Sequence, residues 1–171
     1  MSAKMILVVM FFLKALTLTS LNAAEVQGKV LTYGLVKRTT EEVVVKTPET
    51  TSGATRIPSG FPAITPQTNR IPAKAGVAFG MVYEISGLTA KDGEEVEIVK
   101  VVTHPPMTKP DGSVSKGFIF LEKVPVKAGR AWAFTGYSLD HNYELVTGDW
   151  TFEMRYARKP VVKQTFSLYR E

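Results

Sequence analysis

The stretch GDWTFEMRYARKPVVKQTFSL, residues 148–168, decides the fold because its apolar residues recur at every second position. One side carries Trp150, Phe152, Met154 and Tyr156, and the other carries Thr151, Glu153 and Arg155. This period of two is typical of a strand with one buried face. The pattern breaks at residues 157–160 and resumes at Val162, so we expect two antiparallel strands and a short turn. Burial of a large apolar side chain contributes roughly 1.5–3 kcal/mol, and the apolar face therefore sets the register.

Five further stretches have the length and composition of strands. They are residues 26–37, IPAKAGVAFGMVYEISG (71–87), EVEIVKVVTHPP (95–106), KGFIFLEKVPV (116–126) and AWAFTGYSL (131–139). With the final pair they make about seven short strands and leave no convincing amphipathic helix between them. This pattern predicts an all-β protein, an antiparallel β-sandwich of the immunoglobulin-like type. A small closed barrel is the main alternative.

Residues 39–70 differ in composition, with four prolines among threonine, serine and glycine. Only Val43 to Val45 resembles a strand. Because proline removes ladder donors, we expect a long connection that lies on the body or along a sheet edge. Connections of this length are often functional.

Residues 1–24 have the order of a secretory signal peptide. A lysine at position 4 precedes the apolar run of residues 5–13, and Asn22-Ala23-Ala24 offers small residues for cleavage. The apolar run is shorter than the about 20 residues of a membrane span, although an uncleaved anchor is an alternative. We expect one domain at residues 25–171 in the periplasm or outside the cell, with no transmembrane segment after cleavage. The chain contains no cysteine, which excludes disulfides.

The net charge of +5 is spread along the chain without a dense basic run. A mild, dispersed excess of this kind gives little support to nucleic-acid binding, and export argues against it.

Histidine occurs only at positions 104 and 141. A metal site would combine these with Asp140, Glu144 or Asp149, but nothing has the close spacing of a zinc or calcium motif. We therefore assign no metal, no cofactor and no catalytic residue. His104 precedes Pro105 and Pro106, which are expected to end its strand.

The loop SLDHNYEL, residues 138–145, is the most polar connection. We expect Asp140 and Asn142 to hydrogen-bond the turn backbone and Tyr143 to anchor the loop, as a tyrosine corner does in related sandwiches. Ser138 lies three residues from His141, but this spacing in the sequence does not indicate a catalytic triad. No serine of the chain lies in a Gly-x-Ser-x-Gly motif.

Three stretches, IPAKAGVAFGMVYEISG, VVTHPP and YELVTGDWTFEMRYARKPVVKQTFSL, occur in this order and cover roughly residues 30–169 with their connections. In this order they resemble a family of small bacterial secreted domains of unknown function. The resemblance implies a secreted β-sandwich, and it brings no reaction, cofactor or catalytic residue to this chain.

These observations favour a non-enzymatic secreted binding or accessory module of the bacterial cell envelope, because recognition on a rigid scaffold usually lies in its loops. The candidate binding residues are His104, Asp140, His141 and Asp149. The expected partner is an envelope or extracellular protein or a glycan. One alternative is a hydrolase or metal-dependent enzyme with a site around His104 and His141. Another is a structural domain that forms homo-oligomers by edge-strand pairing.

Overall fold

The computed structural model describes residues 25–38 and 41–170, and within them it contains ten strands, one 3-10 helix and no α-helix. The elements are β1 (Gln27–Leu35), β2 (Glu42–Lys46), β3 (Ala54–Pro58), β4 (Arg70–Pro72), β5 (Ala78–Ser86), β6 (Glu95–Thr108), β7 (Val114–Lys127), β8 (Arg130–Ser138), η1 (Asn142–Glu144), β9 (Gly148–Tyr156) and β10 (Lys159–Tyr169). The predicted all-β class is confirmed. The expected number of about seven strands is too low, because β2, β3 and β4 lie where the sequence pattern is weak.

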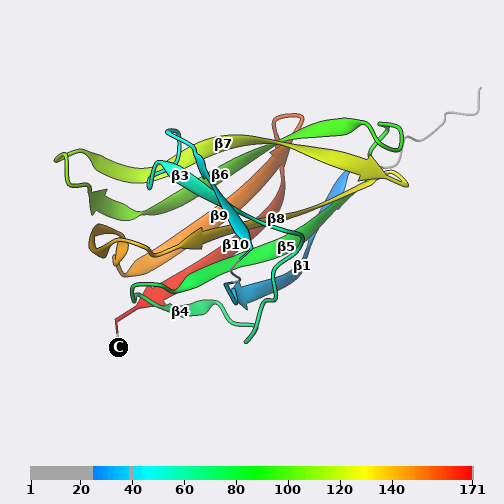
Figure 1. Cartoon of the computed structure of the whole chain (residues 1–171). Coiled ribbons are helices and arrows are strands. Elements are labelled where there is room, and N and C mark those ends of the chain that lie inside the picture. Colours follow the sequence, from blue (N-terminus) through cyan, green and yellow to red (C-terminus); the bar gives the residue numbers. More distant parts are fainter. Residues whose placement is uncertain (1–24, 39–40, 171) are drawn as a thin grey trace, which may run out of the picture.

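Eight of the strands form one hydrogen-bonded order, β1-β5-β8-β7-β6-β9-β10-β4, which folds into two layers. The fold line is between β7 and β8, which pair only where Val126 and Lys127 meet Ala131 and Arg130. Beyond this point the layer β1-β5-β8 faces the layer β7-β6-β9-β10-β4, and β1 contacts β10 across the interior (Figure 1). The predicted sandwich is confirmed. The described strands do not close into a barrel, because β1 and β4, the two ends of the order, share no ladder.

Phe79 of β5 lies at the centre of an aromatic core between the layers. Its ring is 5.1–5.8 Å, centroid to centroid, from the rings of Trp150, Phe152 and Phe166, all in edge-to-face orientation. These four side chains are fully buried. Edge-to-face pairs of this kind add about 0.5–1.5 kcal/mol each beyond the burial of area. The inward face predicted for residues 148–156 is thus the face that closes the sandwich.

The closing hairpin of β9 and β10 confirms the predicted strand pair. Its two turn residues, Ala157 and Arg158, have φ of 47° and 67°, as a two-residue turn between twisted strands requires. The outward residues contact one another: Arg155 Nε lies 2.6 Å from Glu153 Oε1.

The prediction that Pro105 and Pro106 end their strand is wrong, because β6 continues through both to Thr108. The ladder with β7 shifts register between Thr103 and Met107, and the prolines lie inside this irregular segment. The ladder requires no backbone N–H donor there, so proline is tolerated. Gly148 faces the same segment with φ of 122°. A Cβ atom there would lie 2.9 Å from Pro105 Cγ, so this position requires glycine.

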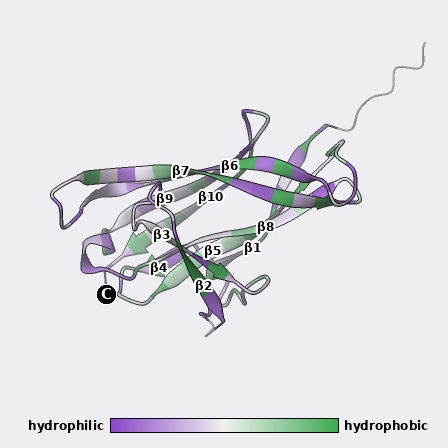
Figure 2. Ribbon diagram, turned by 45° about the horizontal axis from the view of Figure 1, so that its top comes forward, coloured by the Kyte–Doolittle hydropathy of each residue, from purple (hydrophilic) through white to green (hydrophobic). Residues whose placement is uncertain are grey.

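Residues 39–70 are not a connection without structure, because β2 and β3 form an antiparallel hairpin within them. The hairpin pairs with no other described strand, and both views show it as a separate ribbon that crosses the sandwich (Figures 1 and 2). The expected signal peptide, residues 1–24, lies outside the described residues. Among residues 25–38 and 41–170, no helix has the length and hydropathy needed to cross a membrane.

Candidate interaction surface

The β2–β3 hairpin turns an apolar face away from the sandwich. Side chains alternate along a strand, so Val43 and Val45 lie on one face of β2, and Ile57 lies beside Val43 in the register with β3. These three side chains are 63%, 42% and 52% exposed. Figure 2 shows the same concentration of hydrophobic colour on this ribbon. Apolar side chains on a strand pair that is not packed against a core are typical of an interaction site.

Asp140 ties the hairpin to the loop that follows β8. Arg56 Nε of β3 donates to Asp140 Oδ2 at 3.0 Å, and Arg38 Nη1 donates to Oδ1 at 2.9 Å. All three side chains are partly exposed, so each ion pair contributes about 0–1 kcal/mol. Asp140 therefore holds the hairpin through Arg56 and the segment before β2 through Arg38, and its side chain does not bond the turn backbone as expected from the sequence.

The hairpin tip has a second anchor at His104. Thr51 Oγ1 lies 3.0 Å from His104 Nε2 and 2.9 Å from Ser115 Oγ. Thr47, Thr50 and Thr51 are all buried at this tip. A hydroxyl beside a histidine has the spacing of a nucleophile and its base, but the tip covers both groups. The contact is suited to holding the tip in place.

His104 is held as a neutral ring beneath the tip. Its Nδ1 lies 2.8 Å from the Pro105 carbonyl oxygen, which can only accept, so Nδ1 carries the proton and Nε2 accepts from a hydroxyl. The ring lies 4.8 Å from the Trp150 ring, centroid to centroid. Burial lowers the pKa of His104, and the bond to Pro105 opposes this shift.

This shift predicts a pH dependence of stability. The unfolded chain takes up the His104 proton near the ordinary pKa, and the folded chain takes it up only at lower pH, so the free energy of unfolding falls as pH drops through this window. The slope is at most about 1.4 kcal/mol per pH unit. Urea unfolding between pH 7.5 and 5 is expected to give a smaller slope of the free energy of unfolding against pH for His104→Gln than for the unchanged protein. The unchanged protein is the reference, and equal slopes for the two proteins would contradict this account.

Glu144 organises the loop between β8 and β9, a role that was not predicted from the sequence. It is fully buried. Its Oε1 accepts from the Tyr137 hydroxyl at 2.7 Å, and its Oε2 accepts the backbone N–H groups of Asp140 and His141 at 2.7 and 2.8 Å. Burial and the nearby carboxylate raise the pKa of Tyr137, which keeps its hydroxyl as a donor. Tyr143, the expected anchor, packs partly buried against the core, and its ring stacks on His141.

The four residues predicted to bind do not form one cluster. His104 and Asp140 hold two different parts of the hairpin, whereas His141 is exposed on the loop beside Tyr143. Asp149 is exposed on β9, opposite Ser167 of β10. Within residues 25–38 and 41–170, no group of three histidine or carboxylate side chains is arranged to hold a metal ion.

Lys100 is a buried cation that connects the two layers where β7 and β8 part. Lys100 Nζ of β6 lies 2.7 Å from Glu122 Oε2 and donates to the Phe134 carbonyl at 3.0 Å. Burial lowers the pKa of Lys100, and Glu122 opposes the shift. The Tyr83 hydroxyl is buried without a hydrogen-bond partner among the described residues, and burial, with Glu122, raises its pKa. The sequence carries a signal for this cluster, because Lys100 occupies an inward position between Ile98 and Val102.

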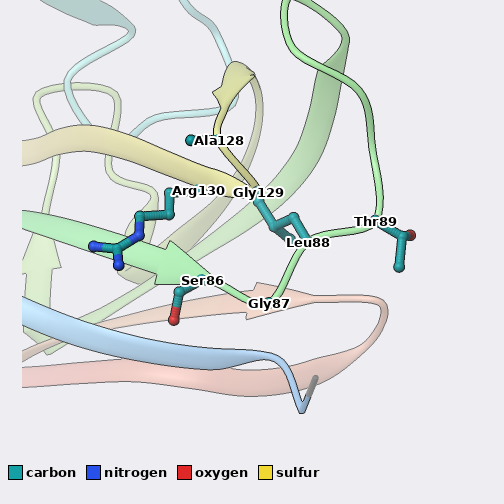
Figure 3. Close-up of a pocket in the computed structure, with 7 residues that line it drawn as sticks. All are labelled: Ser86, Gly87, Leu88, Thr89, Ala128, Gly129 and Arg130. Atoms are coloured by element: carbon teal, nitrogen blue, oxygen red, sulfur yellow. The ribbon is translucent and has the colours of Figure 1, made fainter. Parts of the chain in front are cut away.

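Two open hollows lie at the opposite end of the sandwich from the Asp140 loop, near the turn between β7 and β8. One, of about 360 Å³, lies among Ser86, Gly87, Leu88, Thr89, Ala128, Gly129 and Arg130 (Figure 3). Arg130 is the single charged residue of this lining, and its guanidinium is 3.3 Å from Glu84. The other, of about 660 Å³, includes Phe61 and Trp132. Neither gathers acid, base and nucleophile.

Comparison with known proteins agrees with this fold. Residues 25–168 match the family described as a domain of unknown function, DUF3859. An immunoglobulin-like protein from Pseudomonas aeruginosa is similar in structure, with a TM-score of 0.60 and 23% identity over 86% of this chain and 99% of that one. No protein with a curated description matches the chain.

Two weaker likenesses involve much longer chains. One is the alkylpurine DNA glycosylase AlkC of Pseudomonas fluorescens, with a TM-score of 0.41 and 13% identity over 63% of this chain and 28% of that one. The other is a β-glucosidase of Listeria innocua, with a TM-score of 0.44 and 10% identity over 86% of this chain and 16% of that one. Likenesses of this strength carry no argument about fold or function.

Proposed function

We propose that this chain, which belongs to the DUF3859 family, is a non-enzymatic binding module that is exported to the bacterial cell envelope. The order of charged, apolar and small residues in positions 1–24 supports export. The apolar outward face of the hairpin, formed by Val43, Val45 and Ile57, carries the proposal of binding.

The way the hairpin is held supports this role. Its tip is fixed at His104 and its middle at Asp140, so the outward face is presented in one orientation. A face that is fixed before binding loses less conformational entropy when a partner covers it. The face consists of branched aliphatic side chains, which suit an apolar protein surface better than a glycan. The proposed partner is therefore a protein of the envelope.

Replacement of Val43, Val45 and Ile57 by serine is expected to abolish capture of the partner. The immobilised protein would be incubated with an envelope extract of the source organism, and retained proteins would be identified by mass spectrometry. We expect a discrete set with the unchanged protein and loss of that set with the triple variant. The three positions are exposed, so the fold should persist, which near-UV circular dichroism would verify.

A matched control removes exposed apolar area from another strand. Ile119 and Leu121 of β7 are 63% and 49% exposed, and their replacement by serine should leave capture unchanged. Capture that survives the hairpin variant, or that is lost only in the β7 variant, would reject the hairpin as the binding surface.

A further inference from the structure

The edge of β2 that faces away from β3 has no partner strand among the described residues. Thr47 N–H donates to Gly53 O at the end of the hairpin. Because bonded pairs alternate along an antiparallel ladder, Val43 and Val45 bond to β3, and the N–H and C=O groups of Val44 point to the open edge. Val44 is 55% exposed. An open edge of this kind is a template for another strand.

The sequence of β2, EVVVK, is complementary to itself in the antiparallel direction. With two copies centred on Val44, that residue lies opposite its own counterpart and Val43 lies opposite the partner's Val45. Glu42 then lies opposite the partner's Lys46, and twofold symmetry produces this pair twice. Opposite charges that face each other across two strands are favourable. Within the chain, Glu42 Oε2 lies 3.9 Å from Arg38 Nε, which is too long for a hydrogen bond, and the Glu42 side chain is 12% exposed.

The neighbouring registers lose this match. A shift that centres the pairing on Val45 places Lys46 opposite the partner's Val44, and a shift that centres it on Val43 leaves Lys46 beyond the paired segment. Only the register centred on Val44 pairs all five residues of β2 with both charges matched. The charge pattern therefore selects one alignment.

We propose that two copies of this chain associate through β2, edge to edge and antiparallel, into a four-stranded sheet of order β3-β2-β2-β3. The proposal concerns the edge of the hairpin and goes beyond the binding role of its outward face. In the paired sheet the apolar faces of both hairpins become one continuous surface. The contact is short, and stable interfaces bury about 1,200–2,000 Å², so we expect a dimer that dissociates on dilution.

A single cysteine tests the alignment, because the chain has none of its own. In the proposed pairing, Val44→Cys brings two thiols together at a Cα separation of about 5.5 Å, within the range of a disulfide. The matched control is Val114→Cys, at a valine of β7 that is 58% exposed. We expect Val44→Cys to form the disulfide-linked dimer at least about tenfold faster, since pairing raises the effective concentration of the thiols. Equal rates would overturn the proposal.

Charge reversal tests the register by sedimentation equilibrium of the purified protein. Glu42→Lys and Lys46→Glu each create two like-charge pairs and are expected to raise the dissociation constant by about tenfold or more. The double variant, Glu42→Lys with Lys46→Glu, restores both opposite pairs and should recover the dimer. A protein that is monomeric at every concentration, or a dimer that is insensitive to the single reversals, overturns the proposal. Loss of the dimer with retained, face-dependent capture of partners would reject only edge pairing and leave the proposed function intact.

Discussion

Phe79→Ala is expected to lower the free energy of unfolding by about 3–5 kcal/mol, the range for loss of a buried phenylalanine. Phe79 extends from β5 into the opposite layer, where its ring meets Trp150 and Phe152 of β9 and Phe166 of β10. Truncation leaves a cavity between the layers and removes three edge-to-face pairs at once. Since domains are stable by about 5–15 kcal/mol in total, the variant should be close to unfolding at room temperature. Urea unfolding followed by tryptophan fluorescence measures the loss.

The control for this prediction is Phe61→Ala, the same substitution at a phenylalanine that is 59% exposed. A surface substitution of this kind usually changes stability by no more than about 0.5 kcal/mol. Comparable losses at the two positions would show that the core is not centred on Phe79.

Glu144→Ala is the second substitution with a large expected effect, a loss of about 3 kcal/mol or more. Its carboxylate accepts from the Tyr137 hydroxyl and from two backbone N–H groups. Alanine leaves these three donors without an acceptor in a buried place, and each unsatisfied donor is costly. One of the donors is the N–H of Asp140, which holds the hairpin. We therefore expect faster hydrogen exchange in residues 42–58, together with the loss of stability.

Two further variants serve as controls for this prediction. Glu144→Gln keeps one carbonyl acceptor and should lose less stability than alanine, whereas Glu97→Ala, at an exposed carboxylate of β6, should lose almost none. If Glu144→Ala were as stable as Glu97→Ala, the carboxylate would not be the organising group of the loop. Unchanged hydrogen exchange in residues 42–58 would show that the loop does not control the stability of the hairpin.

The loop at residues 138–145 illustrates the limit of local sequence patterns. Its polar composition correctly marks a turn, and Asp140 and Tyr143 are reasonable anchors for one. The groups that hold it are nevertheless Glu144 and Tyr137. Tyr137 was assigned to a strand, and its contact with Glu144 depends on where β8 ends relative to η1. Lys100 is a different case, because a charged residue in the inward phase of a strand is a local signal for a buried partner, but the prediction did not use it.

The alternation of apolar and polar residues determined the two layers and their aromatic core, since the side-chain period of a strand is a local property that each segment carries by itself. The tertiary structure alone decided the position of the hairpin and the use of its anchors. Asp140 meets Arg38 and Arg56 across 102 and 84 residues of sequence, and Thr51 meets His104 across 53. Such contacts depend on how the layers bring distant segments together. The alternation of apolar and polar residues within one strand contains no information about which distant segments will meet.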